Sequence, residues 1–412
     1  MKRLFIFLTL LFLLVSCNEV EPDVKVNPDR TLSLTTKQIE FVNEGHGFDF
    51  SLIHKVSEKE KADWVMSPFG VQVLLGMILN GAQGETAEQI YNVLGFENKD
   101  IDEVNDYFRS MLQQLPELDY KTEVMLANGV FVNKKYKIKP TFSRYVRNYY
   151  SAYVENLDFS KTSSLKRIND WCNEQTEGLV PKMLDEKTMS GMSDDIALLL
   201  NALYFKGEWT DKFDVKDTSN EPFHLESGVV KEVPMMKKTL LLAAGSFTED
   251  GSMIQVPFGK KSFALTIILP GDDSSLNELI NKLDDGTQEC CNRFIEKSGD
   301  YIFDLWMPRI EAASSIDYRD ILSDMGMSKA FSPGVAELRA MCDNDPYIKT
   351  ISQNAVLSLD EEGVRAAAAS FVRVGAGAAP KPATFHADRP FLYLISELTS
   401  GIILFAGAYT GI

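Results

Sequence analysis

The segment of residues 363–380 constrains the fold of this 412-residue chain more than any other stretch, because its composition suits two different structures. Every even-numbered position from 364 to 376 carries a small or apolar side chain, whereas both arginines, Arg365 and Arg373, are at odd positions. Side chains alternate between the two faces of a β-strand, so this pattern predicts a strand with one face fit for burial. Four consecutive alanines have poor β-propensity, however, and an Ala/Gly-rich composition is also typical of linkers. We therefore predict a segment that is a loop in one state and a strand in another.

Further motifs follow one another along the chain in an order typical of one known family. They are MSPFGVQVLLGMILNGAQGETAEQI (66–90), INDWCNEQTEGLVPKML (168–184), NALYFKGEW (201–209), MPRI (307–310) and TSGIILFAGAYTGI (399–412). Together with EEGVRAAAAS (361–370) and ADRPFLYLI (387–395), they resemble the serpins, the serine protease inhibitor superfamily. The resemblance implies a single α+β domain over residues 35–412 with the serpin fold. That fold has three β-sheets, about nine helices, a five-stranded central sheet that can accept a sixth strand, and an exposed reactive-centre loop.

Local patterns agree with an α+β class, since helices dominate the first part of the chain and strands the later part. Thr35 or Thr36 can cap a helix that runs toward Val56, and Ser67 is a cap followed by proline at the first helical position. Further helices are expected at 86–94, 101–115, 141–150, 164–177, 276–283 and 318–322. Strands are expected at 124–132, 153–159, 196–205, 301–307 and 348–359, with several more between 229 and 270. The near-continuous apolar run 196–205 is typical of a central strand covered on both faces.

What the resemblance implies about function is covalent inhibition of an endopeptidase. A serine protease, or a cysteine protease, attacks a bond in the exposed loop and forms an acyl-enzyme. Before water hydrolyses it, the loop inserts into the central sheet and carries the bound protease along, which requires a kinetically trapped native state. The hinge positions that match the family are Gly363, Val364, Ala366, Ala367, Ala368 and Ala369. A non-inhibitory serpin acting as a binding or carrier module is the alternative, although such members tend to have charged, bulky or proline residues in the hinge.

The position of the reactive bond follows from the family's commonest spacing, counted from Gly363. It falls between Gly377 and Ala378, with Ala376-Gly377 as the adjacent register. None of these residues could fill a deep specificity pocket, so an elastase-like or subtilisin-like target is expected. Cleavage after Arg373 by a trypsin-like enzyme would leave only a short segment to insert.

One group of residues that the resemblance assigns, the breach, lies where the loop enters the sheet. There Glu361 is expected to pair with Arg309 beside Trp209. The alternative is a solvated surface pair that contributes about 0–1 kcal/mol.

A second group, the shutter, is expected lower in the sheet as a hydrogen-bonded cluster of Ser67, Gly70, Asn201 and Gln353. Two of these depart from the family pattern, which has serine and histidine where this chain has Gly70 and Gln353. Gln353 can still donate and accept hydrogen bonds, but Gly70 cannot replace a hydroxyl. The shutter is therefore expected to be either weaker or differently wired.

The first residues predict export. Residues 1–16 combine a basic start with an apolar run too short to span a membrane, and Leu14-Val15-Ser16-Cys17 resembles the bacterial lipoprotein cleavage box. We expect a lipid on Cys17, a disordered tether over residues 17–34, and a place on the bacterial outer membrane or cell surface. Ordinary signal cleavage beside an incidental cysteine is the alternative.

Composition narrows the list of partners. The net charge of −17 disfavours nucleic acid, and six acidic against two basic side chains over residues 99–119 disfavour heparin, which some serpins bind there. The sequence contains no G-x-S-x-G, H-E-x-x-H or phosphate-loop motif, so neither an enzyme nor a cofactor is expected, and a hydrolase has little support. The cysteines after Cys17 show no metal-type spacing and are interpreted as buried or incidental thiols, with a disulfide of Cys172 or Cys342 left open. We expect a monomer.

Overall fold

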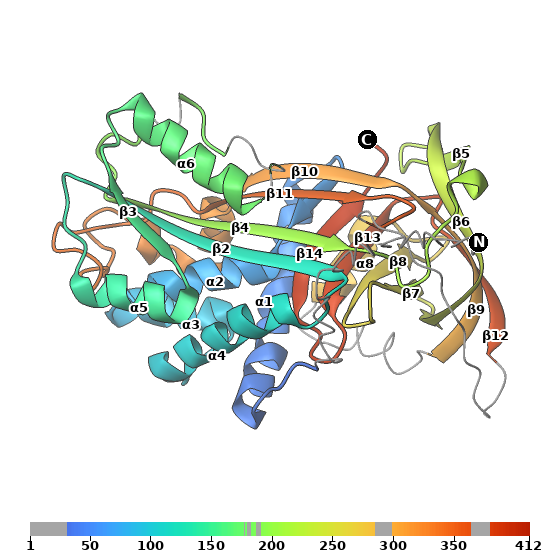
Figure 1. Ribbon diagram of the computed structural model, residues 1–412, viewed down its shortest axis with the longest axis horizontal. Helices are drawn as coiled ribbons and strands as arrows, with labels where there is room; N and C mark the ends of the chain where they lie inside the picture. Colours follow the sequence, from blue (N-terminus) through green and yellow to red (C-terminus); the bar gives the residue numbers. More distant parts are fainter. Residues whose placement is uncertain (1–30, 177, 179–182, 187–190, 285–298, 364–379) are drawn as a thin grey trace, which may run out of the picture.

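The computed structural model describes residues 31–412 except 177, 179–182, 187–190, 285–298 and 364–379 (Figure 1). The α-helices in these residues are α1 (Thr36–Lys59), α2 (Pro68–Leu79), α3 (Gly84–Leu94), α4 (Ile101–Gln114), α5 (Pro140–Tyr150), α6 (Thr162–Gln175), α8 (Leu276–Asp284) and α10 (Arg319–Leu322). The strands are β1 (Trp64–Met66), β2 (Thr122–Asn133), β3 (Tyr153–Leu157), β4 (Ala197–Gly207), β5 (Ser219–His224), β6 (Val230–Phe247), β7 (Gly251–Pro257), β8 (Phe263–Pro270), β9 (Gly299–Pro308), β10 (Ile310–Asp317), β11 (Ser352–Leu359), β12 (Lys381–His386), β13 (Phe391–Glu397) and β14 (Ile403–Tyr409). The α+β prediction is confirmed.

The strands form three hydrogen-bonded sheets within the part of the chain that the structure describes. The largest has the order β1-β14-β13-β8-β7-β6-β9-β12, with β5 paired to β6. The other two are β3-β2-β4 and β10-β11, which lie side by side with α6 over one face and α2 to α5 on the other (Figure 1). These five strands correspond to the expected central sheet. No ladder of backbone hydrogen bonds joins β4 to β11 within the described ranges, so a seam separates them, called here the β4–β11 seam.

Helices α1 and α2 begin where the sequence predicts, because side chains satisfy their first free N–H groups. Thr35 accepts from Gln38 N and Gln38 accepts from Thr35 N, which forms a capping box. Ser67 accepts from Gly70 N at the start of α2, and Pro68 occupies the first helical position. All twelve residues of α2 are buried, so this helix is a rigid part of the core. Side chains that are hydrogen-bonded to its N-terminus are therefore held in place.

Several expected boundaries were wrong, and the partner strand explains each case. The strand expected over 348–359 begins only at Ser352, because Ser352 pairs with Asp317, the last residue of β10. The strand expected over 153–159 ends at Leu157, which pairs with Asn133 at the end of β2. Strand β10 itself was not predicted, since its sequence IEAASSID is rich in Ala and Ser, which have modest β-propensity.

The packed part of the chain includes residues before α1. Leu32 is 6% exposed and belongs to the main core cluster. Ser33 N donates to Gln114 Oε1 over 2.9 Å, and Gln114 Nε2 returns a bond to Ser33 O over 3.2 Å. The end of the expected tether is therefore docked against α4, while Cys17 and the expected signal lie outside the described residues. Within those residues, no helix combines the length and apolar character needed to cross a membrane.

Candidate functional site: the breach and the shutter along the β4–β11 seam

The salt bridge between Arg309 and Glu361 lies at the end of β11. Arg309 Nη2 is 2.8 Å from Glu361 Oε1, and Arg309 Nε is 3.1 Å from both carboxylate oxygens. Thr218 Oγ1 also donates to Oε1, over 2.5 Å. The Glu361 side chain is only 3% exposed, against 38% for Arg309, so this is not a fully solvated pair. Burial alone would raise the pKa of Glu361, but the hydrogen bonds from Arg309 and Thr218 outweigh burial, and the pKa is lowered.

Trp209 closes the same end of the seam from the β4 side. Its indole Nε1 donates to Asp360 O over 2.7 Å, and its backbone N–H donates to Glu362 O over 3.3 Å. The ring is stacked on Phe258 with centroids 4.5 Å apart and is 2% exposed. Residues just after β4 are thus hydrogen-bonded to residues just after β11.

Directly after β11 the chain reverses in a tight turn. Gly363 N donates to Asp360 O over 3.1 Å, and the two residues form an isolated antiparallel bridge. Gly363 has φ +85°, in the left-handed region that favours glycine. A Cβ there would lie 2.3 Å from Gly207 O and 2.6 Å from Trp209 N, so only glycine lets the turn rest against the end of β4. The other hinge residues (Val364, Ala366–Ala369) and the reactive bond (Gly377, Ala378) lie outside the described residues.

Gln353 holds the middle of β11 against the N-terminus of α2. Ser67 N donates to Gln353 Oε1 over 2.7 Å, and Gln353 Nε2 donates to Ser67 O over 3.1 Å. The side-chain amide therefore pairs with the backbone of Ser67 as a neighbouring strand would. Tyr318 OH donates to the same Oε1 over 3.2 Å, so each polar atom of the buried amide has a partner.

Asn201, on β4, belongs to a separate chain of hydrogen bonds. Its Nδ2 donates to Asn128 Oδ1 over 2.9 Å, and Asn128 Nδ2 donates to Tyr150 O over 2.8 Å. The Oδ1 atom of Asn201 is buried and has no hydrogen-bond partner within the described part of the chain. The structure thus brings the four expected shutter residues together, but the bonds divide into one set for β11 and another for β4.

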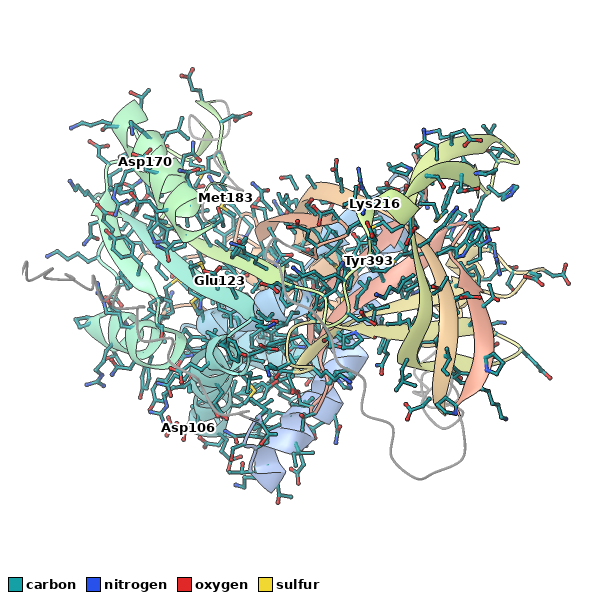
Figure 2. The ribbon with its side chains drawn as sticks, turned by 45° about the vertical axis from the view of Figure 1, so that its right-hand side comes forward. Asp106, Glu123, Asp170, Met183, Lys216 and Tyr393 are labelled. Atoms are coloured by element: carbon teal, nitrogen blue, oxygen red, sulfur yellow. The ribbon has the colours of Figure 1, made fainter. Side chains whose placement is uncertain are left out.

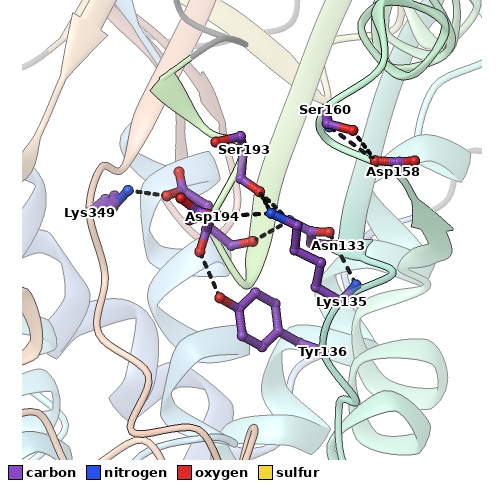
Figure 3. Close-up of polar contacts among 9 residues, drawn as sticks. Asn133, Lys135, Tyr136, Asp158, Ser160, Ser193, Asp194 and Lys349 are labelled. Carbon is purple, nitrogen blue, oxygen red and sulfur yellow. Dashed lines mark hydrogen bonds and ion pairs between the residues drawn. The ribbon is translucent and has the colours of Figure 1, made fainter.

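The opposite end of the seam has an ion pair that the sequence did not single out. Lys349, just before β11, pairs with Asp195, just before β4 (Figure 3). Asn133 Nδ2 donates to Ser193 O and Asp195 O over 3.0 Å each, which fixes this loop to the end of β2. The two charges are 154 residues apart in the chain, so only the fold reveals their contact.

Met183 and Leu184, which follow α6 in the chain, contact both α6 and β11. Asn169 Oδ1, on α6, accepts from the backbone N of Met183 and of Leu184 over 2.9 Å each. Asn354 Nδ2, on β11, donates to Met183 O over 3.4 Å, and Figure 2 shows Met183 beside α6. These two residues therefore link α6 to β11.

Other reactive groups show structural contacts only. Among the described residues, no cluster of three His, Cys, Asp or Glu side chains could hold a metal ion. Cys172 and Cys342 are free, buried thiols, and burial raises the pKa of Cys172 to about 12. His46 makes a 3.1 Å hydrogen bond between Nε2 and Gly401 O. Cys290 and Cys291 lie outside the described residues.

Comparison with known proteins places this architecture. The family model "Serpin (serine protease inhibitor)" matches residues 44–411. The human leukocyte elastase inhibitor is 30% identical over 374 residues, covering 88% of this chain and 97% of that protein. Serpin-Z10 of Arabidopsis thaliana is 30% identical over 358 residues, covering 83% and 90%. The crystal structure of Serpin48 from the insect Tenebrio molitor superposes with TM-score 0.76 at 27% identity, covering 92% of this chain and all of that one. The native thermophilic serpin tengpin superposes with TM-score 0.79 at 24% identity, covering 94% and 98%.

The fold and the family match define a serpin-type α+β protein. The chain belongs to the serpin family, and several of its relatives are named as protease inhibitors.

Proposed function

We propose that this protein is an inhibitory serpin that traps serine endopeptidases by inserting its reactive-centre loop into the β4–β11 seam. The observation that carries the proposal is the turn at Asp360 and Gly363. A chain that continued from this turn in an extended conformation would run back along the seam, between two strands that no hydrogen-bond ladder joins in the described residues. A strand that entered there would run antiparallel to β11 and satisfy backbone groups on both sides.

The register of that strand can be extended from the turn in steps of one residue. If the pairing that begins at the Asp360–Gly363 bridge continued, position 364 would lie opposite Leu359, 366 opposite Leu357, 368 opposite Ala355 and 370 opposite Gln353. Directly opposite residues share one face of an antiparallel pair. Those four β11 residues are 1–3% exposed, so the small and apolar even-numbered loop residues would join the buried face.

A second contact gives the same register from β4. Trp209 N donates to Glu362 O, as in a hydrogen-bonded antiparallel pair. Eight residues back along β4 lies Asn201, and eight residues forward from Glu362 lies Ser370. An inserted strand in this register would therefore bring Ser370, the polar member of the even-numbered set, between Asn201 and Gln353. Its hydroxyl could donate to the unpartnered Oδ1 of Asn201.

Target choice rests on the loop sequence and on the relatives. Gly377 and Ala378 suit an elastase-like or subtilisin-like protease, and similar proteins are named leukocyte elastase inhibitors. A non-inhibitory role as a binding or carrier module is less well supported, because the even-numbered hinge residues are small or apolar and would suit the buried face of the seam.

The test is incubation of the purified protein with pancreatic elastase. We expect an adduct that survives SDS, and a released C-terminal fragment that begins at Ala378, or at Gly377 in the adjacent register. Elastase with its active-site serine blocked is the control and should form no adduct. Cleavage without an adduct, or adducts only with trypsin-like enzymes cut after Arg373 or Lys381, would contradict the proposal.

We also propose that the mature protein is attached to a bacterial membrane through a lipid on Cys17, on the outer membrane or cell surface. The support is the Leu14-Val15-Ser16-Cys17 sequence. Residues up to Arg30 would then connect the lipid to the domain, which is packed from Leu32 onward. We propose a monomer that binds neither heparin nor nucleic acid, and the support is the net charge of −17.

A further inference from the structure

Gly70 occupies a position at which glycine has no local advantage. It is the third residue of α2 and is fully buried, and its φ is not positive. Alanine is normally preferred to glycine in such a helical position, because glycine loses more backbone entropy on folding. A requirement for glycine must therefore come from what surrounds it.

The surroundings leave no room for a side chain. A Cβ on Gly70 would lie 2.3 Å from Asn201 Oδ1, 2.7 Å from Gln353 Nε2 and 3.0 Å from Ser67 Oγ. The first two distances are below any normal carbon contact, and both atoms belong to buried amides. Gln353 and Asn201 thus occupy the volume that a side chain at position 70 would need.

We propose that Gly70 and Gln353 act as one coupled unit that positions β11 at the seam. The absent side chain at position 70 lets the Gln353 amide reach both backbone groups of Ser67. Strand β11 is then anchored to α2, whereas β4 is anchored by Asn201 to Asn128 and onward to Tyr150. The amides of Gln353 and Asn201 do not bond to each other across the middle of the seam. The seam therefore opens when Gln353 loses its hydrogen bonds to Ser67, because β11 is then no longer anchored to α2 at that level. The shutter residues of this chain therefore have a different set of hydrogen-bond partners, and not only fewer hydrogen bonds.

The stability part of this inference is independent of protease inhibition. Gly70→Ala should lower the thermal midpoint of the intact protein, although helix propensity alone predicts a rise. Gly47→Ala is the matched control, because Gly47 is also helical and a Cβ there meets nothing within 4 Å. The control should leave the midpoint unchanged or raise it. A Gly70→Ala variant that behaves like Gly47→Ala would overturn the inference.

Coupling is measured by repeating Gly70→Ala in a Gln353→Ala background. Gly70→Ala should lower the thermal midpoint clearly less in the Gln353→Ala background than in wild type, because one of the two clashing amides is absent. If Gly70→Ala alone does not fold, recovery of folded protein in the double variant gives the same answer. Equal losses in both backgrounds, or a double variant that also fails to fold, would refute the coupling.

The kinetic part rests on the proposed function. Intact Gln353→Ala should convert on incubation to a loop-inserted form at least about tenfold faster than wild type, because the substitution removes both hydrogen bonds that join β11 to Ser67. Gln72→Ala is the control, since Gln72 is also a buried amide on the α2 side, with its Nε2 2.6 Å from Asp49 Oδ1 and away from the seam. It should lower the midpoint without that acceleration. Equal acceleration of the conversion in Gln353→Ala and Gln72→Ala would overturn the positioning role of Gln353. If no variant converted, the result would contradict the insertion mechanism itself. The coupling of Gly70 and Gln353 would then be decided by the thermal midpoints of the single and double variants.

Discussion

Arg309 donates two hydrogen bonds to the carboxylate of Glu361, from Nη2 over 2.8 Å and from Nε over 3.1 Å. The pair lies at the point where β11 ends and the chain turns back. The next residues form the turn that lies against the end of β4, so this ion pair holds the start of that turn in place. The contact is charge-assisted and nearly shielded from water on the Glu361 side, which makes it stronger than an ordinary surface pair.

Glu361→Gln should lower the stability of the intact protein by about 1–2 kcal/mol, with the difference depending on pH. The folded-state pKa of Glu361 is below its ordinary value of 4.5, so the ionised form contributes stability that is fully present above about pH 4.5. That contribution is lost as the pH falls through the folded pKa. Thermal midpoints measured from pH 7 to pH 3 should therefore show a constant gap between wild type and Glu361→Gln above pH 5, and a shrinking gap below 4.5. A gap that widens in acid would contradict this assignment.

Val364→Arg should convert the inhibitor into a substrate. In the proposed register, position 364 would lie opposite Leu359 on the buried face, where an unpaired charge costs about 3–5 kcal/mol. Insertion would stall at its first step, and hydrolysis of the acyl-enzyme would win, while the intact protein would melt as wild type does. The matched control is Arg365→Glu, on the outward face, which should inhibit normally. The measurement is the stoichiometry of inhibition, and a Val364→Arg variant as effective as wild type would disprove the mechanism.

Ser370→Val should weaken the inserted state selectively. In the proposed register the hydroxyl of Ser370 would lie between Asn201 and Gln353, and its loss would leave a buried acceptor unsatisfied at a cost of about 1–3 kcal/mol. The intact protein should keep its thermal midpoint, whereas the loop-cleaved protein should melt lower than cleaved wild type. Ser370→Thr retains the hydroxyl and should behave as wild type. If the Val and Thr variants melt alike after cleavage, the register is wrong.

Lys349→Met should speed the completion of insertion. Lys349 and Asp195 pair across the lower end of the seam, near where the last inserted residues would arrive. Lys349 is 42% exposed, so the intact protein should lose no more than about 1 kcal/mol. Lys206→Met is a suitable control, because Lys206 makes only a 4.0 Å contact with Glu123 at the other end of β4. Stopped-flow measurement of loop insertion during elastase inhibition should be faster for Lys349→Met alone, and equal rates would remove this role.

Cys17→Ala should release the protein from membranes. The expected lipid on Cys17 anchors the domain without a spanning helix. Expression in a bacterial host followed by fractionation should move the variant from the membrane to the soluble fraction. A substitution in the tether, such as Asn18→Ala, should leave the distribution as in wild type, and an unchanged distribution for Cys17→Ala would exclude lipid attachment.

Sequence reasoning located the elements with strong local signals. The cap at Ser67 and Pro68 and the apolar run of β4 were visible because capping and burial act within a few residues. The Ala/Ser-rich strand β10 was missed, and the ends of β3 and β11 were set by where their partner strands stop. Pairing partners are far apart in the chain, so a local pattern cannot predict such limits.

The sequence by itself determined the family, the alternating pattern of the loop and the positions of the expected breach and shutter residues, because each of these is written in residue type and spacing. Only the tertiary structure decided which hydrogen bonds and ion pairs those residues make. The alternation of loop residues predicts a buried face but not the strands that it would pair with, whereas the turn at Gly363 and the contact of Trp209 are the basis of the register proposed for insertion. Likewise, in the sequence Gly70 indicates only that the hydroxyl typical of the family is absent. The structure shows that the buried amides of Gln353 and Asn201 occupy the volume that a side chain at position 70 would need. The physical reason is that hydrogen-bond direction and excluded volume depend on atoms brought together across the whole chain.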